Sequence, residues 1–189
     1  MAEAGRVIAG TARSIRLDAP GPGTRPFGDR VKQTLFAILE PELPGARFLD
    51  LFAGSGAAGI EALSRGAAAA TFVERDRTAI AVIHANLERT HLGARATVVR
   101  GDALAWLREP SRDDEPPWSV AVVDPPYADT EALAAALEAL GPRLPPGGRV
   151  IAKHFWRDTP PARIGLLASE RERRFGETAL TFYRRTEDG

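Results

Sequence analysis

At 189 residues the chain is long enough for one domain, which buries about 70% of its unfolded surface and needs no disulfide or metal to fold. Apolar residues make up 44% and charged residues 26%, as in a globular protein. The absence of cysteine excludes disulfides, thiolate metal sites and cysteine nucleophiles, and three histidines leave little for a zinc site. We therefore expect no bound metal. No apolar run approaches roughly 18 residues and no secretory leader opens the chain, so we expect a cytoplasmic protein that does not contact membranes.

The charges are unevenly distributed along the chain. The 25 basic and 25 acidic residues cancel, but residues 1–34 carry a net charge of +3, residues 35–148 of −6 and residues 149–185 of +5. Basic ends that flank an acidic middle indicate a polyanionic partner, although a chance distribution explains the pattern equally well. Only Lys32 and Lys153 are lysines, a bias toward arginine that we attribute to base composition.

The first elements form a small extension. Residues 6–17 read as a short β-hairpin or as two extended pieces broken near Gly10, and the Pro/Gly-rich residues 18–28 as a loop. A helix is predicted from Asp29, where apolar side chains begin to recur at helical spacing, and Pro41 ends it.

A regular alternation of strands and helices follows. The predicted strands are residues 48–52, 70–74, 96–100, 119–124 and 148–155. The predicted helices are residues 56–66, 76–91, 103–108 and 130–141, and residues 109–117 form a loop. Runs such as VAVV are apolar on both faces, as strands of a buried parallel sheet are. Five β-α repeats in series predict an α/β fold, with a parallel sheet covered by helices.

The end of the chain breaks this alternation. Residues 156–163 cannot hold a full helix because they contain Pro160 and Pro161. Residues 164–174 and 178–185 read as two strands joined in a hairpin. An antiparallel hairpin at the end of a parallel sheet is unusual for a dinucleotide-binding fold.

A glycine-rich turn follows the first predicted strand of the alternation. Gly54, Gly56 and Gly59 have the spacing G-x-G-x-x-G, and Glu74 ends the next strand, where a ribose-binding carboxylate belongs. Strand, turn, helix and acid together predict a site for an adenosine-type cofactor. The structural alternative is a tight turn that needs glycine for its backbone alone.

Two carboxylates indicate which cofactor binds. Asp50 precedes the glycine turn, and Asp124 ends a strand expected beside the first one. They would repel the pyrophosphate of NAD, and they suit the sulfonium and ammonium of S-adenosylmethionine. One pair of unit charges about 4 Å apart interacts by roughly 4 kcal/mol at an effective dielectric of 20. Asp102 offers a further acceptor for an adenine amino group, or equally an N-cap for the helix after it.

The residues that follow the strand VAVV are Asp124, Pro125, Pro126 and Tyr127. Two prolines fix the backbone and remove two N–H donors, so the carbonyl of Pro125 is held rigidly beside the carboxylate of Asp124. These two acceptors match the two hydrogens of an exocyclic amine and aim its lone pair away from themselves. The ring of Tyr127 offers a stacking surface for a base. The alternative is a proline-rich loop that merely ends a strand.

LDLFAGSG followed by DPPY resembles the S-adenosylmethionine-dependent amino-methyltransferases of the Rossmann-like class. GTRPFGDRVKQTLFAIL, GIEALSRGA, FVERD and RFGETALTFYRR extend the resemblance over nearly the whole chain, to the bacterial 16S ribosomal RNA guanine-N2 methyltransferases of the RsmD type. The resemblance implies a class I methyltransferase fold, α/β with a seven-stranded, mostly parallel sheet whose last strand is reversed. It also implies transfer of one methyl group to N2 of a guanine in 16S ribosomal RNA, free or within a small-subunit assembly particle. We expect a monomer.

The resemblance also assigns residues. The target amine and base are held by Asp124, Pro125, Pro126 and Tyr127. The cofactor site is lined by Asp50, Ala53, Gly54, Ser55, Gly56, Glu74, Asp102 and Ala103. An RNA-facing extension, residues 1–44, contacts nucleic acid through Arg25, Arg30 and Lys32, and residues 45–189 form the methyltransferase domain.

The chain departs from the family pattern in two places. Where the family has R-P-T-x-D, this chain has Phe27 and Gly28 before Asp29, so a hydroxyl is lost beside the target base. Lys153 stands where a glutamate often ends the fifth strand, which changes the floor of the pocket. The first departure bears on the substrate more than on methyl transfer.

We expect direct in-line transfer, with Asp124 as an anchor for the amine and catalysis arising mostly from orientation. Three other functions fit the sequence. The first is methylation of adenine N6 or of another amine or amide, on DNA or on a protein. The second is an NAD-dependent oxidoreductase, which a cofactor-binding assay separates. The third is a non-enzymatic RNA-binding module, against which the intact DPPY argues.

Overall fold

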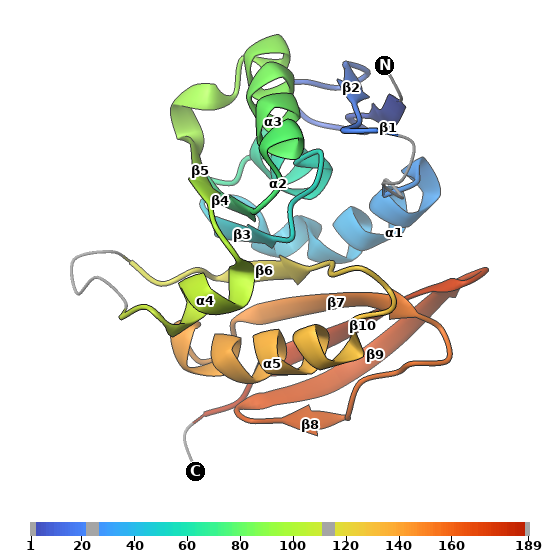
Figure 1. Ribbon diagram of the computed structural model, residues 1–189, viewed down its shortest axis with the longest axis vertical. Helices are drawn as coiled ribbons and strands as arrows, with labels where there is room; N and C mark the ends of the chain where they lie inside the picture. Colours follow the sequence, from blue (N-terminus) through green and yellow to red (C-terminus); the bar gives the residue numbers. More distant parts are fainter. Residues whose placement is uncertain (1–2, 22–26, 111–115, 188–189) are drawn as a thin grey trace. The chain divides into compact units, whose positions relative to one another are not determined.

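Figure 1 shows the computed structural model, which describes residues 3–21, 27–110 and 116–187. The chain forms two compact units, Met1–Gly101 and Asp102–Gly189. Within the described ranges, no helix is long and apolar enough to cross a membrane.

The first unit contains three of the five parallel strands that the alternation predicts. Strands β3 (Arg47–Leu51), β4 (Ala69–Glu74) and β5 (Ala96–Arg100) lie in the order β5-β4-β3, and all run in the same direction. Helix α2 (Ala57–Ser64) connects β3 to β4, and helix α3 (Arg77–Thr90) connects β4 to β5. All residues of α2 are buried, as expected of a crossover helix that packs on the sheet.

Helix α3 has clear end signals in the sequence. The side chain of Asp76 accepts a 2.8 Å hydrogen bond from the amide of Ala79, which makes Asp76 the N-cap. At the other end His91 adopts a left-handed conformation with φ of 57° and closes the helix. The predicted range, residues 76–91, therefore differs from the observed helix only by these two capping residues.

The N-terminal hairpin is confirmed, but its two short strands lie at and beyond the ends of the predicted range, residues 6–17. Its strands are β1 (Glu3–Arg6) and β2 (Arg16–Asp18), which pair antiparallel. Val7 continues the pairing through hydrogen bonds with Ser14 and Ile15. Beyond it the amides of Ile8 and Ala9 donate to the carboxylate of Glu61 on α2 at 2.8 and 3.0 Å. Because Glu61 is fully buried, this tethers the segment to the core of the unit.

The predicted first helix is confirmed as α1 (Asp29–Leu39). A short 3-10 helix, Glu40–Glu42, continues it, with Pro41 at its start. The buried face of α1 consists of Lys32 and apolar side chains at helical spacing, among them Leu35 and Phe36.

The second unit begins with α4 (Ala103–Arg108) and then has β6 (Val120–Val123), α5 (Thr130–Leu140) and β7 (Arg149–Phe155). Strands β6 and β7 are parallel, and α4 packs beside α5 (Figure 1). A 3-10 helix, Gly141–Arg143, follows α5. The four valine and alanine side chains of β6 are all buried, as its apolar sequence predicts.

The antiparallel hairpin at the end of the chain is confirmed. Strand β10 (Thr178–Arg185) pairs with β9 (Leu167–Phe175) and, on its other side, with β7, against which it runs antiparallel. The strand order in this unit is β6-β7-β10-β9-β8. The two-residue strand β8 (Arg163–Ile164) pairs with β9. It brings the strands from β3 to β10 to eight, one more than the seven expected. The predicted reversed last strand is β10.

Candidate active site

The glycine turn after β3 has a backbone that ordinary residues rarely adopt. Gly54 and Gly56 have φ of 55° and 74°, and Phe52 just before them has φ of 58°, which is uncommon for a residue with a side chain. A Cβ at Gly59 would lie 2.3 Å from the ring of Phe72 in β4, so this glycine allows α2 to pack closely on the sheet. The glycines thus serve the tight turn and the helix–strand contact that the motif requires.

Two of the predicted cofactor-site carboxylates hold this turn in place. Oδ2 of Asp50, which is 2% exposed, accepts a 2.9 Å hydrogen bond from the amide of Gly59. Oε2 of Glu74 accepts a 2.9 Å hydrogen bond from the amide of Gly54, and its Oε1 accepts from Asp76 at 2.9 Å. Glu74 is only half-buried. The structure therefore brings Asp50, the glycine turn and Glu74 together, as predicted.

Asn86, in the middle of α3, is a member of this region that the sequence analysis missed. Its amide nitrogen donates to the carbonyls of Ser55 and Asp18, both at 3.0 Å, and its oxygen accepts from the amide of Asp18 at 2.9 Å. It is fully buried. The available signal was a polar residue on the apolar face of a helix, which indicates a buried hydrogen-bonding role.

The other predicted cofactor residues lie in different settings. Ala53 and Ser55 are 8% exposed within the glycine turn. Asp102 and Ala103 belong to the second unit, where Asp102 is the N-cap of α4 and accepts from the amide of Ala105 at 2.9 Å. The capping role considered for Asp102 is thus confirmed, and its contact with adenine stays a prediction.

The DPPY residues begin directly after β6. Oδ2 of Asp124 accepts a 2.7 Å hydrogen bond from Nζ of Lys153 on β7, and the two side chains are 17% and 5% exposed. Burial raises the pKa of the Asp124 carboxyl, and the ammonium of Lys153 partly opposes this rise. Lys153 thus pairs with the residue that the sequence assigns to the target amine.

The rest of the motif is fixed by its own contacts. The hydroxyl of Tyr127 forms a 2.6 Å hydrogen bond with that of Thr178 at the start of β10. The carbonyl of Pro126 accepts from the amide of Asp129 at 2.8 Å, whereas the carbonyl of Pro125 accepts none from the described backbone. Asp124 is thus held by Lys153, and the role of the Pro125 carbonyl as a second acceptor stays a prediction.

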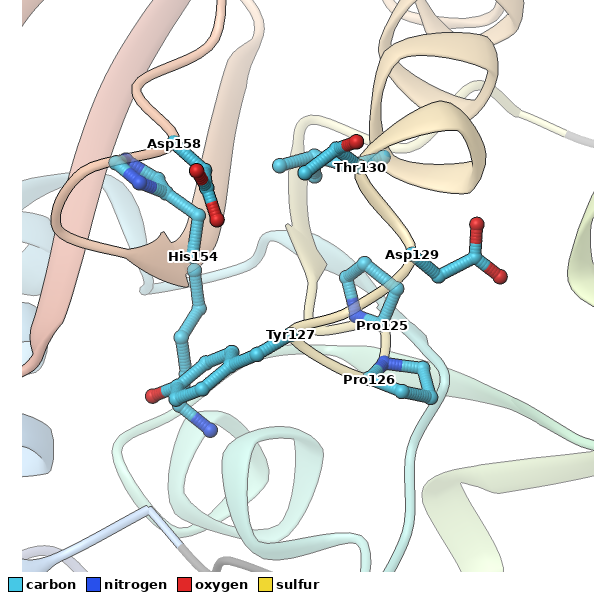
Figure 2. A pocket seen from close by; sticks show the side chains of 9 residues that line it. Pro125, Pro126, Tyr127, Asp129, Thr130, His154 and Asp158 are labelled. Atoms are coloured by element: carbon cyan, nitrogen blue, oxygen red, sulfur yellow. The ribbon is translucent and has the colours of Figure 1, made fainter.

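A small pocket lies beside the motif. Figure 2 shows Pro125, Pro126 and Tyr127 on the loop after β6; His154 of β7 and Asp158, which follows β7, also line the pocket. The ring nitrogen Nε2 of His154 lies 2.8 Å from the hydroxyl of Thr181, and the imidazole is almost fully buried. His154 is therefore held by the strand next to it, in agreement with a structural role.

The three residues assigned to nucleic acid have different outcomes. Arg25 lies outside the described residues, and Arg30 is exposed on α1. Lys32 is fully buried: it donates to the carbonyl of Arg6 and lies 4.0 Å from Glu61. Its ammonium has no access to a phosphate, so that prediction is wrong for Lys32. Phe27, one of the two departures from the family pattern, is also buried, at 6% exposed.

In the described ranges, no group of three or more His, Asp and Glu side chains could hold a metal ion. The chemistry of the arrangement lies in hydrogen-bond acceptors: carboxylates at a glycine turn in one unit, and a carboxylate with a rigid carbonyl in the other.

The chain is similar to known proteins over nearly its whole length. The sequence profile of the family described as "Conserved hypothetical protein 95" matches residues 5–184. The chain is 37% identical over 183 residues to "Putative rRNA methyltransferase YlbH" of Bacillus subtilis, which covers 95% of this chain and 98% of that protein. It is 43% identical over 123 residues to "Ribosomal RNA small subunit methyltransferase D" of Escherichia coli, over 65% of this chain and 60% of that protein.

Two solved structures resemble nearly the whole chain. "Putative methyltransferase yhhF" from Escherichia coli superposes with a TM-score of 0.84 and 33% identity, over 97% of this chain and 98% of that one. A protein from Thermus thermophilus, TTHA0928, gives a TM-score of 0.79 and 37% identity, over 94% and 97% of the two chains. The predicted Rossmann-like methyltransferase fold is confirmed by these likenesses.

Proposed function

Because this chain belongs to the family described as "Conserved hypothetical protein 95", the RsmD-type methyltransferases, we propose that it methylates ribosomal RNA. The proposed reaction transfers one methyl group from S-adenosylmethionine to the exocyclic N2 amine of a guanine in 16S ribosomal RNA. The names of the two relatives above support the class of substrate. We propose that the protein acts in the cytoplasm as a monomer.

The observation that carries this proposal is the rigid pair of acceptors at the start of the DPPY motif. Asp124 is fixed by Lys153, and the loop after it is fixed by the Pro126–Asp129 and Tyr127–Thr178 hydrogen bonds. One oxygen of Asp124 and the carbonyl of Pro125 accept the two hydrogens of an amine. Because both acceptors engage hydrogens, the nitrogen lone pair stays free to attack, and Tyr127 stacks on the base that carries the amine.

The residues of the first unit fit S-adenosylmethionine. Glu74 is half-buried and presents a carboxylate at the glycine turn, where the hydroxyls of a ribose need acceptors. We propose that the cofactor is held by Asp50, Ala53, Gly54, Ser55, Gly56 and Glu74. For Asp102 and Ala103 the same role is proposed from the family resemblance alone. When bound, S-adenosylmethionine supplies an electrophilic methyl group on a positively charged sulfur.

Orientation of the amine supplies most of the catalysis. Holding two reactants in near-attack geometry is worth about 7–11 kcal/mol of the activation barrier. No strong base is required of Asp124, because the methylated nitrogen is acidic and loses its proton readily. Asp124 therefore acts as an anchor and not as a general base.

The contacts with RNA are proposed for the two basic ends of the chain. Arg25 and Arg30 belong to the N-terminal extension, residues 1–44, which precedes the methyltransferase domain, residues 45–189. Lys32 is removed from this set because of its burial. The exposed arginines of β9 are the second candidate set, namely Arg171, Arg173 and Arg174.

The test is methyl transfer from labelled S-adenosylmethionine to 16S RNA and to small-subunit particles that lack the modification. We expect one labelled methyl group per RNA, located by nuclease digestion and mass spectrometry at N2 of a guanine. A label on adenine N6 would place the chain among methyltransferases of another base amine. Binding of NAD without binding of S-adenosylmethionine would overturn the proposal altogether.

A further inference from the structure

Both lysines of this chain are buried beside carboxylates. Among 25 basic residues only Lys32 and Lys153 are lysines, and they are 0% and 4% exposed. Lys32 lies 4.0 Å from Glu61, and Lys153 lies 2.7 Å from Asp124. A lysine ammonium is a compact point charge, whereas a guanidinium is a broad planar fork. Base composition explains the many arginines, but it does not explain why the two lysines stand at these two positions.

The register of the sheet places Lys153 opposite Asp124. Strands β6 and β7 are parallel, and Val123 pairs with Ala152. Asp124 and Lys153, the residues that follow this pair, therefore lie side by side where the paired segment ends. Nζ of Lys153 also lies 5.5 Å from the ring centroid of Tyr127, within the range of a cation–π interaction. One buried cation therefore contacts both polar side chains of the DPPY motif.

We propose that Lys153 is a positioning residue, which holds Asp124 as an oriented carboxylate and leaves its Oδ1 to accept one N–H of the target amine. This inference rests on the proposed function, in which Asp124 holds that amine. Lys153 takes Oδ2, and within the described parts of the chain Oδ1 accepts no hydrogen bond. The second N–H of the amine is accepted by the carbonyl of Pro125.

The charge of Asp124 matters because a protonated carboxyl would do the opposite of what the reaction needs. Its O–H would donate to the lone pair of the amine and block the attack on the methyl group. Burial raises the pKa of Asp124 and so favours this unproductive form, while Lys153 opposes it. Lys153 thus keeps the anchor in its accepting form at lower pH than burial alone would allow.

Other titratable groups near this pair have their own contacts. Asp129, His154 and Asp158 line the pocket beside the motif. Asp129 accepts from the amide of Ala132 as the N-cap of α5, and His154 bonds to Thr181. Asp158 is exposed in the segment that follows β7. Within the described structure, the titratable group that hydrogen-bonds the carboxylate of Asp124 is Lys153.

The direct test is the titration of Asp124 by carbon-13 NMR of its side-chain carboxyl, with the signal assigned by its loss in Asp124→Asn. In Lys153→Met the titration midpoint should rise by about 1–3 pH units, the usual effect of removing an opposite charge at this distance. Lys153→Arg should keep the midpoint close to that of the unmodified protein. Lys32→Met, which removes the other buried lysine, should leave it unchanged. If Lys153→Met does not fold, Lys153→Gln provides the same comparison.

The second readout is the pH dependence of methyl transfer to RNA. The acid limb of kcat should move to higher pH in Lys153→Met by the same interval as the carboxyl midpoint, and Lys153→Arg should restore it. A midpoint that does not move in folded Lys153→Met would overturn the proposal. A midpoint that moves while the acid limb stays in place would equally overturn it.

The two readouts separate this inference from the proposed function. If the unmodified protein transfers no methyl group to RNA, the proposed function fails, whereas the carboxyl titration still reports whether Lys153 holds Asp124 ionised. If methyl transfer proceeds and only the Lys153 variants behave otherwise than expected, the positioning role alone is wrong.

Discussion

The amide of Gly54 donates a 2.9 Å hydrogen bond to Oε2 of Glu74, so the carboxylate at the end of β4 is tied to the glycine turn after β3. This contact links the two parts of the cofactor motif, which are 20 residues apart in sequence. The other oxygen of Glu74 accepts from the amides of Arg75 and Asp76, which fixes the orientation of the carboxylate. A ribose hydroxyl would meet an acceptor that is already positioned.

Glu74→Ala should weaken binding of S-adenosylmethionine by about 1–3 kcal/mol, roughly ten- to a hundredfold, because a hydrogen bond to a charged group is lost. Glu74→Gln keeps an acceptor oxygen and should lose less. Isothermal titration calorimetry measures both variants against Glu88→Ala, an exposed glutamate on α3 that should bind normally. Unchanged affinity in Glu74→Ala would remove Glu74 from the cofactor site.

Gly59→Ala should lower the free energy of unfolding by about 1–3 kcal/mol, because the added methyl would lie 2.3 Å from the ring of Phe72 and force a shift of the core. Gly93→Ala is the matched control: no atom lies within 4 Å of a Cβ there, and the change should stay within about 0.5 kcal/mol. Urea denaturation measures both. Equal stability of the two variants would show that α2 does not need glycine to approach β4.

The sequence alone predicted the parts of the site that short motifs encode. The glycine turn, the N-cap at Asp102 and the DPPY loop all depend on residues near one another in the chain, and each is found where it was expected. The pairing of Lys153 with Asp124 joins residues 29 apart, and the contacts of Asn86 with Asp18 join residues 68 apart. Such contacts follow from strand register and helix packing, which local pattern does not determine.

The burial of Lys32 is a second feature that local sequence patterns do not determine. Lysine on a helix is usually exposed, and the family resemblance assigned Lys32 to nucleic acid. The structure instead places it on the apolar face of α1, next to Glu61 on α2. Only the packing of the two helices could reveal this role, because a buried lysine needs a partner carboxylate that is distant in sequence.

Tyr127→Phe should cost about 0.5–1.5 kcal/mol in methyl transfer, because it loses the hydrogen bond to Thr178 but keeps the ring that stacks on the base. Tyr127→Ala should cost more, by the roughly 1–3 kcal/mol that stacking contributes. Single-turnover transfer to RNA measures both, with cofactor affinity as the control that should not change. Thr178→Val, which removes the same hydrogen bond from the other side, should behave like Tyr127→Phe. If Phe and Ala were equally impaired, the hydroxyl and not the ring would carry the role.

Arg30→Ala should weaken binding of RNA and reduce the slope of log K against log salt by about 0.7–1, the effect of one phosphate contact. The comparison is Arg173→Ala on the exposed face of β9. Affinities measured between low and moderate salt assign the contact to the N-terminal extension if only Arg30→Ala lowers the slope. A lower slope in Arg173→Ala alone would move the RNA contact to the last hairpin.

Two substitutions distinguish whether Asp124 acts as an anchor for the amine or as a base. Asp124→Asn keeps an acceptor oxygen but gives up the charge, and Asp124→Ala removes the acceptor. If the residue mainly holds the amine, Asn should retain partial activity and exceed Ala by about 1–3 kcal/mol, roughly ten- to a hundredfold in rate. Both changes leave Lys153 without its carboxylate, so thermal unfolding is measured beside single-turnover methyl transfer. Both variants should bind S-adenosylmethionine almost normally, because these side chains are assigned to the acceptor base. Should Asn prove as inactive as Ala while both variants still bind RNA and cofactor, hydrogen bonding would not explain Asp124, and its charge or a proton transfer would have to carry the reaction.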